Sequence, residues 1–358
     1  MPPNQSVPEF PGLSKGHGAL ASESCSWRNF AVVSTKSPWK LAQPLLARQP
    51  MRVVLVESLE RDRLDGLASD LGGILRIVGI GSGTAMDAAK YIAKKNGMLL
   101  SQVPTTCSNN ACFTRTAGVQ HGGRRVAERL APVPDQIVVD YELMSRAPPR
   151  LNRAGLAEIL CSHTSLKDWE LGRAAGIYEW DENLERFTRG ELRALEQLAP
   201  AIGSDDIDAF VALLDAGARL APFFISHPGV RFNGGSEHLF AWCLDECVGR
   251  RLIHGEAVSL GTVLMAYLQD NEPNWVIKIL MLSRVAFMPD DIGVTWKQVE
   301  DTVMQLPEYA ERAPKYYPYT SVNEFVSADN SGLAELAERF AVARESLIRE
   351  VARHSQGI

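Results

Sequence analysis

The first half of this 358-residue chain alternates short apolar runs with helical segments. The runs are rich in β-branched residues and lie at 30–34, 52–56, 75–78, 99–103 and 136–139. Segments with helical periodicity at 61–71 and 85–95 separate several of them. This alternation is typical of a parallel sheet covered by helices. We therefore predict an α/β fold whose N-terminal part is a doubly wound, Rossmann-like parallel sheet.

Two further patterns define the domain organisation. Between the last two apolar runs, Gly122-Gly123 with polar flanks predicts a hairpin over 116–128 rather than another helical crossover. After Pro148-Pro149 helical periodicity dominates, with apolar stripes over 156–166, 192–198 and 210–220. A chain of this length exceeds a comfortable single core. We expect a flexible lead-in at 1–29, an α/β domain at 30–150 and an all-helical domain at 151–358.

Composition and charge argue against several classes of protein. Hydrophobic residues make up 46% of the chain and charged residues 22%, as in an ordinary globular enzyme. A net charge of -6, without a long run of Lys or Arg, argues against nucleic acid or an anionic membrane as the main partner. No apolar run approaches the roughly 20 residues that span a membrane. Six cysteines without C-x-x-C spacing predict a reducing cytoplasm, with Cys243 and Cys247 as packing thiols.

A glycine-rich turn and a polar loop follow two consecutive runs of the predicted sheet. The turn over 79–84 leads from a predicted strand into a predicted helix, where backbone N–H groups could point at phosphate oxygens. An ordinary strand-to-helix turn also carries such glycines, so this string alone is weak. The loop over 104–110 follows the next strand at the sheet edge where such folds bind ligands, although a capped loop is the alternative interpretation.

Glu57 is a candidate for recognising the ribose of a nucleotide. It follows the apolar residues 53–56, and its carboxylate could accept a hydrogen bond from an adenosine ribose hydroxyl. That contact would favour NAD over NADP. An exposed acidic loop residue is an equally good interpretation of the same position.

Three side chains in the second half have the chemistry of a metal site. Glu158, His238 and His254 provide one carboxylate and two imidazoles, which leaves coordination positions free for substrate or water. An open site of this kind is typical of catalysis, whereas two satisfied helix histidines are the alternative. His163, five residues after Glu158, is rotated off that helical face, so we expect a surface or supporting residue rather than a fourth ligand.

Five motifs occur in order along the chain. They are Gly79-x-Gly-Ser-Gly-Thr-x-x-Asp87-x-x-Lys90, Pro104-Thr-Thr-x-Ser108, Gly155-x-x-Glu158, Ser236-Glu-His238 and His254-Gly-Glu-Ala-Val. Their order and spacing resemble the superfamily of glycerol dehydrogenases and dehydroquinate synthases, the iron-containing alcohol dehydrogenases. Within it the chain is most similar to the sn-glycerol-1-phosphate dehydrogenases. The resemblance covers roughly residues 50–330, and Thr164-Ser-Leu-x-Asp168-Trp169 supports it.

The resemblance implies ligands and cofactors. Glu158, His238 and His254 are expected to bind Zn²⁺ or another divalent metal such as Fe²⁺. Contacts to NAD or NADP are expected from Gly81, Gly83, Thr84, Ala85, Met86, Asp87, Thr105, Thr106, Ser108 and Thr114. The metal would polarise a substrate hydroxyl while the nicotinamide accepts hydride. The domain at 30–150 would then bind the dinucleotide and the domain at 151–358 the metal and substrate, with chemistry at a cleft between them.

Two positions of the expected substrate pocket depart from the resembled enzymes. Asn110 stands where the glycerol-phosphate enzymes carry an aspartate that holds substrate, and an amide cannot take a proton at neutral pH. Trp242 stands where they carry a histidine that contacts substrate. The metal ligand Glu158 is an aspartate in those enzymes and a glutamate in the synthases. We keep Asn110 as a candidate catalytic residue in an altered pocket.

Three functional hypotheses remain. The first is a metal- and NAD(P)-dependent oxidoreductase acting on a small polyol, ketose or polyol phosphate, and expected to be a homo-oligomer as is common in the superfamily. The second is a sugar-phosphate cyclase of the dehydroquinate synthase type, a lyase that uses NAD catalytically. Cys161 argues against it, because those cyclases carry a lysine there. The third is a non-catalytic nucleotide-binding descendant, suggested by Asn110 and Trp242.

Overall fold

The computed structural model describes residues 12–122, 124–128, 133–226, 232–312, 319–325 and 331–356. Tertiary contacts divide the chain into two compact units. The sheet unit comprises the described residues up to Asn152 together with Phe210–Ser226. The helical unit comprises Arg153–Ala209 and the described residues from 232 onward.

A six-stranded parallel sheet forms the sheet unit, as predicted. The strand order is β1 (Leu13–Gly16), β8 (Gln136–Asp140), β5 (Leu99–Pro104), β4 (Arg76–Gly81), β2 (Phe30–Ser34) and β3 (Arg52–Leu55). Each neighbouring pair runs parallel. Because parallel strands need crossovers, helices connect them, and the carboxyl ends of β4 and β5 lie side by side.

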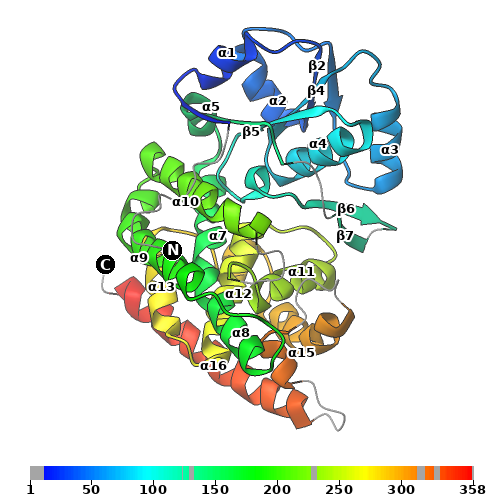
Figure 1. Cartoon of the computed structure of the whole chain (residues 1–358). Helices are drawn as coiled ribbons and strands as arrows, with labels where there is room; N and C mark the ends of the chain where they lie inside the picture. Colours follow the sequence, from blue (N-terminus) through cyan, green and yellow to red (C-terminus); the bar gives the residue numbers. More distant parts are fainter. Residues whose placement is uncertain are drawn as a thin grey trace. The chain divides into compact units, whose positions relative to one another are not determined.

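Helices cover both faces of the sheet, so the doubly wound prediction is confirmed (Figure 1). On one face α3 (Arg61–Ser69) and α4 (Gly83–Asn96) pack against inward-facing residues such as Val33 of β2. On the other face α1 (Ala19–Ser24), α2 (Lys36–Ala42), the 3₁₀ turn η1 (Gln43–Leu45) and α5 (Tyr141–Ser145) enclose residues such as Val32. The alternation of Val32 and Val33 follows from the two-residue period of a strand.

The predicted hairpin is confirmed. After the short 3₁₀ turn η2 (Ala111–Phe113), β6 (Ala117–His121) and β7 (Arg124–Glu128) form a separate antiparallel pair in which Gly118 lies opposite Ala127. Val119 of this hairpin is buried with the core on the α3 and α4 face of the sheet. The hairpin therefore extends the sheet unit without joining the main sheet.

The prediction of a loosely ordered lead-in is wrong for residues 13–28. β1 pairs with β8 at the edge of the sheet, with Leu13 opposite Ile137. The backbone N–H of Leu20 donates to Asp140 at 2.9 Å, and Leu20 and Trp27 are buried in the core. Composition rich in Ser, Gly and Pro misled the prediction, because burial of two large apolar side chains outweighs weak local propensity. Residues 1–11 lie outside the described part.

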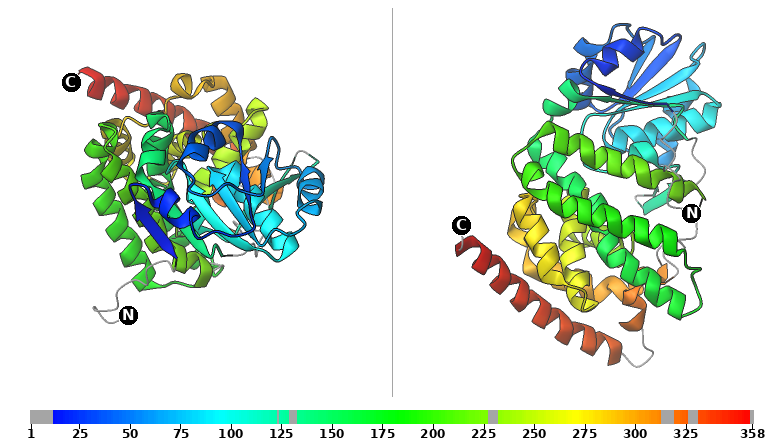
Figure 2. Two further views of the ribbon diagram at one scale, coloured as in Figure 1. Left: turned by 90° about the horizontal axis from the view of Figure 1, so that it is seen from above. Right: turned by 60° about the vertical axis from the view of Figure 1, so that its left-hand side comes forward.

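The helical unit is built around α12 (His254–Leu268), whose residues 255–266 are all buried. Its other elements are η3 (Ala154–Leu156), α7 (Ala157–Leu160), α8 (Ser162–Ala174), α9 (Glu182–Gly203), α11 (Ser236–Val248), α13 (Pro273–Leu282), α14 (Pro289–Ile292), α15 (Trp296–Arg312), η4 (Ser321–Phe325) and α16 (Ser331–Gln356). α7, α8, α11, α13 and α16 all pack on α12, and α16 runs along the outside of the unit (Figure 2). Over the described residues of this unit the all-helical prediction is confirmed.

Two helices link the units along the chain. α6 (Pro149–Arg153) ends at the division, and most of α10 (Ile207–Ser226) groups with the sheet unit. Phe113 packs against Gly217 of α10, and Lys15 forms a 2.8 Å ion pair with Asp215. The predicted domain at 151–358 did not anticipate this grouping, because contacts so distant in sequence leave no local pattern.

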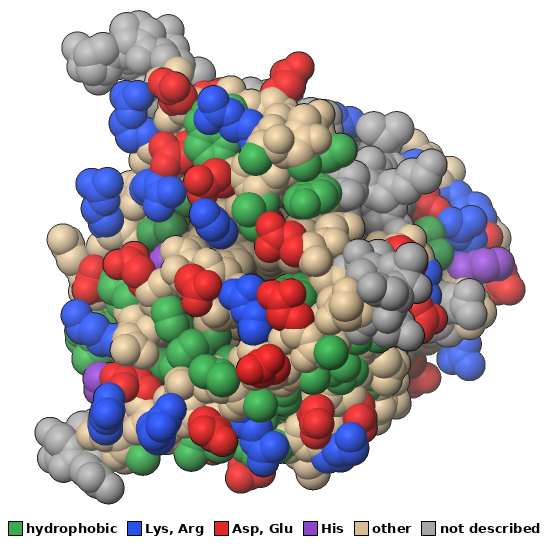
Figure 3. Space-filling view, turned by 90° about the horizontal axis from the view of Figure 1, so that it is seen from below, with side chains coloured by type: hydrophobic (Ala, Val, Ile, Leu, Met, Phe, Trp, Pro, Cys, Tyr) green, Lys and Arg blue, Asp and Glu red, His purple; other side chains and the backbone are tan. Residues whose placement is uncertain are grey.

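Basic and acidic side chains are interspersed over the face shown in Figure 3. Pairs on the helical unit include Arg312 with Glu246 at 3.2 Å and Lys297 with Asp301 at 2.8 Å. Such exposed pairs each contribute at most about 1 kcal/mol. All six cysteines are free thiols, and Cys243 is buried. Among the helices in the described ranges, none combines the length and apolarity needed to cross a membrane.

Candidate functional site

The three predicted metal ligands converge within the helical unit. Glu158 lies in the first turn of α7, His238 in the first turn of α11, and His254 is the first residue of α12. Their ligand atoms all lie within 4.8 Å of one another. Oε1 of Glu158 is 3.4 Å from Nε2 of His254, and the two imidazole centroids are 5.3 Å apart. A carboxylate and two imidazoles in this arrangement fit a zinc or iron ion, with positions left for another ligand.

Two close backbone approaches bring these ligands together. A Cβ atom at Gly255, beside His254, would lie 2.0 Å from the carbonyl oxygen of Ala154 in η3. A Cβ atom at Gly261 would lie 2.7 Å from the carbonyl oxygen of Glu237 in α11. Because both positions are glycine, α12 can lie directly against the segments that precede Glu158 and carry His238.

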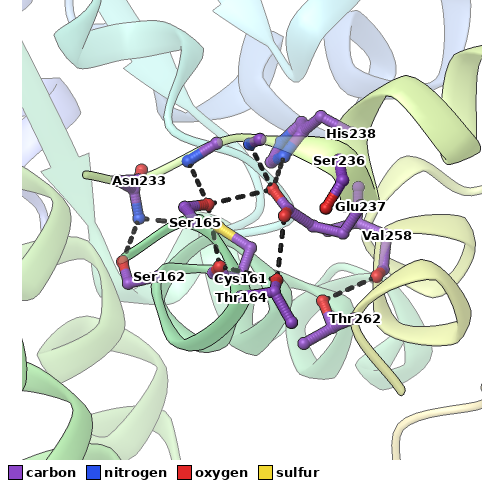
Figure 4. A network of polar contacts seen from close by, with 12 residues as sticks. Cys161, Ser162, Thr164, Ser165, Asn233, Ser236, Glu237, His238, Val258 and Thr262 are labelled. Carbon is purple, nitrogen blue, oxygen red and sulfur yellow. Dashed lines mark hydrogen bonds and ion pairs between the residues drawn. The ribbon is translucent and has the colours of Figure 1, made fainter. Parts of the chain in front are cut away.

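A buried carboxylate, Glu237, contacts the ring of His238 (Figure 4). Oε1 of Glu237 is 2.8 Å from Nδ1 of His238 and accepts the N–H of Gly235 at 2.6 Å. The hydroxyls of Ser165 and Thr164 lie 3.1 and 2.8 Å from the two carboxylate oxygens. Burial alone would raise the pKa of Glu237, but the hydrogen bond and charge of His238, with the Gly235 N–H, outweigh it and lower the pKa. Groups that can donate hydrogen bonds thus surround both carboxylate oxygens of Glu237.

A second group of possible ligands overlaps the first. Cys161, Glu237 and His238 also place ligand atoms within 4.8 Å of one another. Burial, followed by the charge of Glu237, raises the pKa of the Cys161 thiol well above its ordinary value. Metals bind the thiolate form. Since Glu237 is already hydrogen-bonded to His238, this group supports the first site rather than forming another.

Asp168 ties together three elements around the candidate metal site. Its Oδ2 accepts the N–H of Ser236 at 2.6 Å, where α11 begins. Its Oδ1 accepts the N–H of Ser321 in η4 at 2.7 Å and the side-chain amide of Gln269, just after α12, at 3.0 Å. Complete burial, with the nearby charge of Glu237, raises the pKa of Asp168 to about 6. Asp168 thus fixes the start of the helix that carries His238.

Sequence reasoning missed the roles of Glu237 and Asp168. Both lie in motifs that carried the resemblance, and a carboxylate directly before a candidate ligand was the available signal. The partners of these carboxylates are distant in sequence: Thr164 and Glu237 are separated by 73 positions. Spacing alone could not pair them.

His163 and Trp242 lie in the same unit as the candidate ligands. His163 is buried, with Nε2 2.7 Å from the carbonyl oxygen of Asn271 and its ring 5.0 Å from that of Trp275. A surface position is therefore wrong, because the side chain is buried, and burial lowers the pKa of His163. The supporting role stays a prediction. Trp242 is half-buried, and its ring lies edge-on to His238 with centroids 6.0 Å apart.

In the sheet unit, the glycine-rich turn and the polar loop meet. Gly81 ends β4 and accepts the N–H of Thr105, just after β5, at 2.9 Å. The hydroxyl of Ser82 is 2.8 Å from that of Ser108, which is 2.8 Å from that of Thr106. Strand pairing therefore places hydroxyls of both predicted nucleotide motifs beside the start of α4, where N–H groups attract anions.

Other predicted cofactor contacts occupy different environments. Gly83 and Thr84 are half-buried in the first turn of α4, whereas Ala85 and Met86 are buried, so only their backbone could face a ligand. Glu57 is exposed beyond β3. The ribose contact proposed for Glu57 stays a prediction.

Asp87 and Thr114 belong to an internal network around Lys90. Nζ of the fully buried Lys90 is 2.9 Å from Asp87, 3.0 Å from the carbonyl oxygen of Ala111 and 3.3 Å from the hydroxyl of Thr114. Asp87 also accepts the N–H of Gly118 at 3.0 Å. These residues fasten the loop after β5 to α4. Any contact that Asp87 or Thr114 makes to a dinucleotide is additional to this structural role.

Asn110 directly precedes η2 in the loop that Lys90 fastens. It is half-buried, and its carbonyl oxygen accepts the N–H of Phe113 at 2.9 Å. Its predicted catalytic role stays a prediction.

Known proteins resemble this chain in both sequence and fold. The model of a family described as iron-containing alcohol dehydrogenase matches residues 31–148. A glycerol-1-phosphate dehydrogenase [NAD(P)+] from Staphylothermus marinus is 32% identical over 229 residues, covering 62% of each chain. The corresponding protein of Aeropyrum pernix is 28% identical over 63% of this chain and 62% of that one. The sequence similarity to iron-containing alcohol dehydrogenases thus lies in residues 31–148, and the similarity to glycerol-1-phosphate dehydrogenases covers about 62% of the chain.

The extent of these similarities differs. The chain spans 62% of the length of each of those two curated relatives. The crystal structure of a probable glycerol dehydrogenase from Sinorhizobium meliloti has a TM-score of 0.73 and covers 95% of this chain and 99% of its own. At 18% identity that likeness demonstrates the shared fold alone. In sequence, the chain is similar to glycerol-1-phosphate dehydrogenases, as the motifs predicted.

Replacing Lys90 by Met should destabilise the sheet unit. The change leaves the buried carboxylate of Asp87 without its cation, and breaking a buried pair costs about 3–5 kcal/mol. Chemical denaturation measures the free energy of unfolding. Lys94→Met is the matched control, because Lys94 is an exposed lysine on the same helix whose ion pair with Glu128 contributes at most about 1 kcal/mol. Equal effects of the two changes would contradict a structural role for Lys90.

Asp168 should give stability a pH dependence of defined sign. Its folded pKa of about 6 lies above the ordinary 3.8, so between about pH 4 and 6 the folded protein holds a proton that the unfolded chain has released. Protonation of Asp168 therefore contributes fully to the free energy of unfolding below pH 4, and this contribution is lost as the pH rises to 6. A pKa difference of about two units, at 1.36 kcal/mol per unit, amounts to about 3 kcal/mol. The free energy of unfolding of wild type minus that of Asp168→Asn should therefore be larger at pH 4.5 than at pH 7, and a larger difference at pH 7 would contradict the assignment.

Replacing Glu158 by Ala should abolish metal binding, because two neutral imidazoles alone make a weak site. Zn²⁺ at 100 times its Kd should stabilise the wild-type protein by about 2.7 kcal/mol and raise its Tm. Glu158→Ala should show no such rise at the same zinc concentration. Glu182→Ala, which removes an exposed glutamate on α9, is the control and should respond like wild type. A full zinc response in Glu158→Ala would rule out this ligand set.

Proposed function

We propose that the protein is a metal-dependent NAD(P) oxidoreductase that acts on a small polyol, ketose or polyol phosphate. The observation that carries the proposal is the convergence of Glu158, His238 and His254 from three separate elements. The relatives' names support the same class, since they are glycerol-1-phosphate dehydrogenases [NAD(P)+]. A fold shared with dehydrogenases agrees with it.

Residues of the helical unit would hold the metal and orient the substrate. A divalent ion held by Glu158, His238 and His254 would act as a Lewis acid on the substrate oxygen. Glu158 supplies the negative charge of this ligand set, which favours retention of a cation. His254 is about one-third exposed while Glu158 and His238 are nearly buried, so substrate would approach from the His254 side.

Residues of the sheet unit would hold the dinucleotide, which supplies the hydride acceptor or donor. The N–H groups at the start of α4 would face the pyrophosphate. The hydroxyls of Thr106 and Ser108, held beside Ser82, would donate to or accept from the cofactor. Lys90 would keep the loop after β5 in register by binding carbonyl oxygens at Ala111 and Thr116.

Asn110 in the sheet unit and Trp242 in the helical unit each differ from the residue that contacts substrate in the resembled enzymes. An amide at Asn110 can donate and accept hydrogen bonds without changing charge. Trp242, one helical turn after His238, presents an aromatic ring where a titratable imidazole would otherwise lie. We infer a small neutral or phosphorylated polyol whose carbon face packs against the indole. A homo-oligomeric state and a cytoplasmic location remain part of this proposal.

The cyclase alternative is not favoured. Cys161 is a buried thiol whose pKa is raised by burial, so it cannot replace the charge of a cyclase lysine. The relatives' names likewise describe dehydrogenases. Release of phosphate without net change in nicotinamide absorbance would instead indicate a cyclase.

Activity with a substrate panel tests the proposal. Purified protein with Zn²⁺ or Fe²⁺ should change nicotinamide absorbance in stoichiometric proportion to at least one polyol, ketose or polyol phosphate. Glu158→Ala should lower kcat/KM by at least about a thousandfold, or about 4 kcal/mol, if the metal stabilises developing charge on the substrate oxygen. Native mass spectrometry should detect bound dinucleotide and metal in the same wild-type protein. Failure with every compound in the presence of both cofactors would refute the proposal.

A further inference from the structure

We propose that Glu237 is a positioning residue that selects which ring nitrogen of His238 faces the metal. The inference rests on the proposed metal site, and it assigns a role to a side chain that is not itself a ligand. Nδ1 of His238 lies 2.8 Å from Oε1 of Glu237, and Glu237 is fully buried. Nδ1 of His238 is therefore hydrogen-bonded to Glu237 inside the protein.

The hydrogen bond between Nδ1 and Glu237 determines the tautomer of His238. A neutral imidazole carries one proton, on Nδ1 or on Nε2. Oε1 of Glu237 accepts the N–H of Gly235 and Oε2 faces the Thr164 hydroxyl, so the carboxylate is placed as an acceptor; the proton of His238 therefore belongs on Nδ1, where it is donated to Glu237. The opposite tautomer would set a nitrogen lone pair against a carboxylate oxygen. With the proton on Nδ1, Nε2 keeps the lone pair that a metal requires.

Three further groups hold the Glu237 carboxylate in place. The N–H of Gly235 donates to Oε1 at 2.6 Å, and the hydroxyl of Ser165 lies 3.1 Å from the same atom. The hydroxyl of Thr164 lies 2.8 Å from Oε2. Figure 4 shows the carboxylate between the hydroxyls of α8 and the ring of His238. The carboxylate thus cannot turn away from His238 without losing contacts on both oxygens.

One short stretch of chain consequently serves two ligands. Glu158 offers its own carboxylate, while Thr164 and Ser165, at the start of α8, orient His238 through Glu237. Asn233 reinforces this stretch by donating to the carbonyl oxygen of Glu158 at 2.6 Å and to the hydroxyl of Ser162 at 2.7 Å. Residues of α7 and α8 therefore provide one candidate ligand, Glu158, and orient another, His238, through Glu237.

Glu237→Gln tests the inference because it keeps the shape and removes the charge. In the variant the amide oxygen can still accept from Nδ1 of His238. The amide N–H₂ then faces the hydroxyl of Thr164, which in the wild type lies against a carboxylate oxygen. We expect the affinity for Zn²⁺, measured by competition with a chromophoric chelator, to fall about 10- to 100-fold. Dinucleotide binding should be unchanged.

Histidine tautomers provide a readout that a purely structural role would not move. In metal-free protein labelled with ¹⁵N-histidine, His238 should be the Nδ1–H tautomer in wild type, with its signal assigned by its loss in His238→Asn. In Glu237→Gln the signal should shift towards a mixture of tautomers. Thr164→Val, which leaves the Glu237 contact to His238 in place, should weaken zinc binding by a smaller factor. This second variant keeps the test valid if Glu237→Gln does not fold.

Glu191→Gln is the matched control, since Glu191 is a buried carboxylate on α9, a helix that supplies none of the groups in contact with Glu237. Suppose that the wild-type protein binds zinc and that Glu237→Gln and Thr164→Val both keep its zinc affinity and its His238 tautomer. That outcome would overturn this inference but not the proposed function. An equal loss of affinity in Glu191→Gln would also overturn it. A wild-type protein that binds no divalent metal would overturn the proposed function as well, which separates the two failures.

Discussion

The close approach of α12 to η3 and α11 is the constraint on which the helical unit depends. At Gly255 and Gly261 a Cβ atom would meet a backbone oxygen of the neighbouring element. Without those atoms, α12 lies directly against the segments that carry Glu158 and His238. Packed interiors of this density resist compression and displacement. The spacing of the three candidate ligands is therefore a property of the packed helices rather than of flexible side chains.

Two buried carboxylates inside this packing have opposite environments. Glu237 contacts an imidazole, two hydroxyls and a backbone N–H, and its pKa is lowered despite its burial. Asp168 receives backbone and amide donors while burial and the charge of Glu237 raise its pKa to about 6. A buried charge costs free energy unless hydrogen bonds replace its water. Burying these carboxylates lowers the stability of the helical unit, but it holds the groups around the candidate site in fixed orientations, and function often has this cost.

The fold was largely predictable because its signals are local. β2 begins with four consecutive apolar residues, and the hairpin of β6 and β7 surrounds a Gly-Gly turn. β1 was missed because four residues at a sheet edge carry no periodic pattern, and their pairing depends on β8, more than 120 positions away. The grouping of α10 with the sheet unit depends likewise on distant contacts such as Phe113 against Gly217.

The sequence by itself determined the periodicity of each element and the chemical identity of the candidate ligands. Both depend on side-chain type and on neighbours a few positions apart, so Glu158, His238 and His254 could be chosen before any coordinates were known. Only the tertiary structure decided that these three meet, that His163 is buried against Trp275, and that Glu237 holds His238. Such contacts follow from how whole helices pack, and no local pattern in the chain encodes that packing.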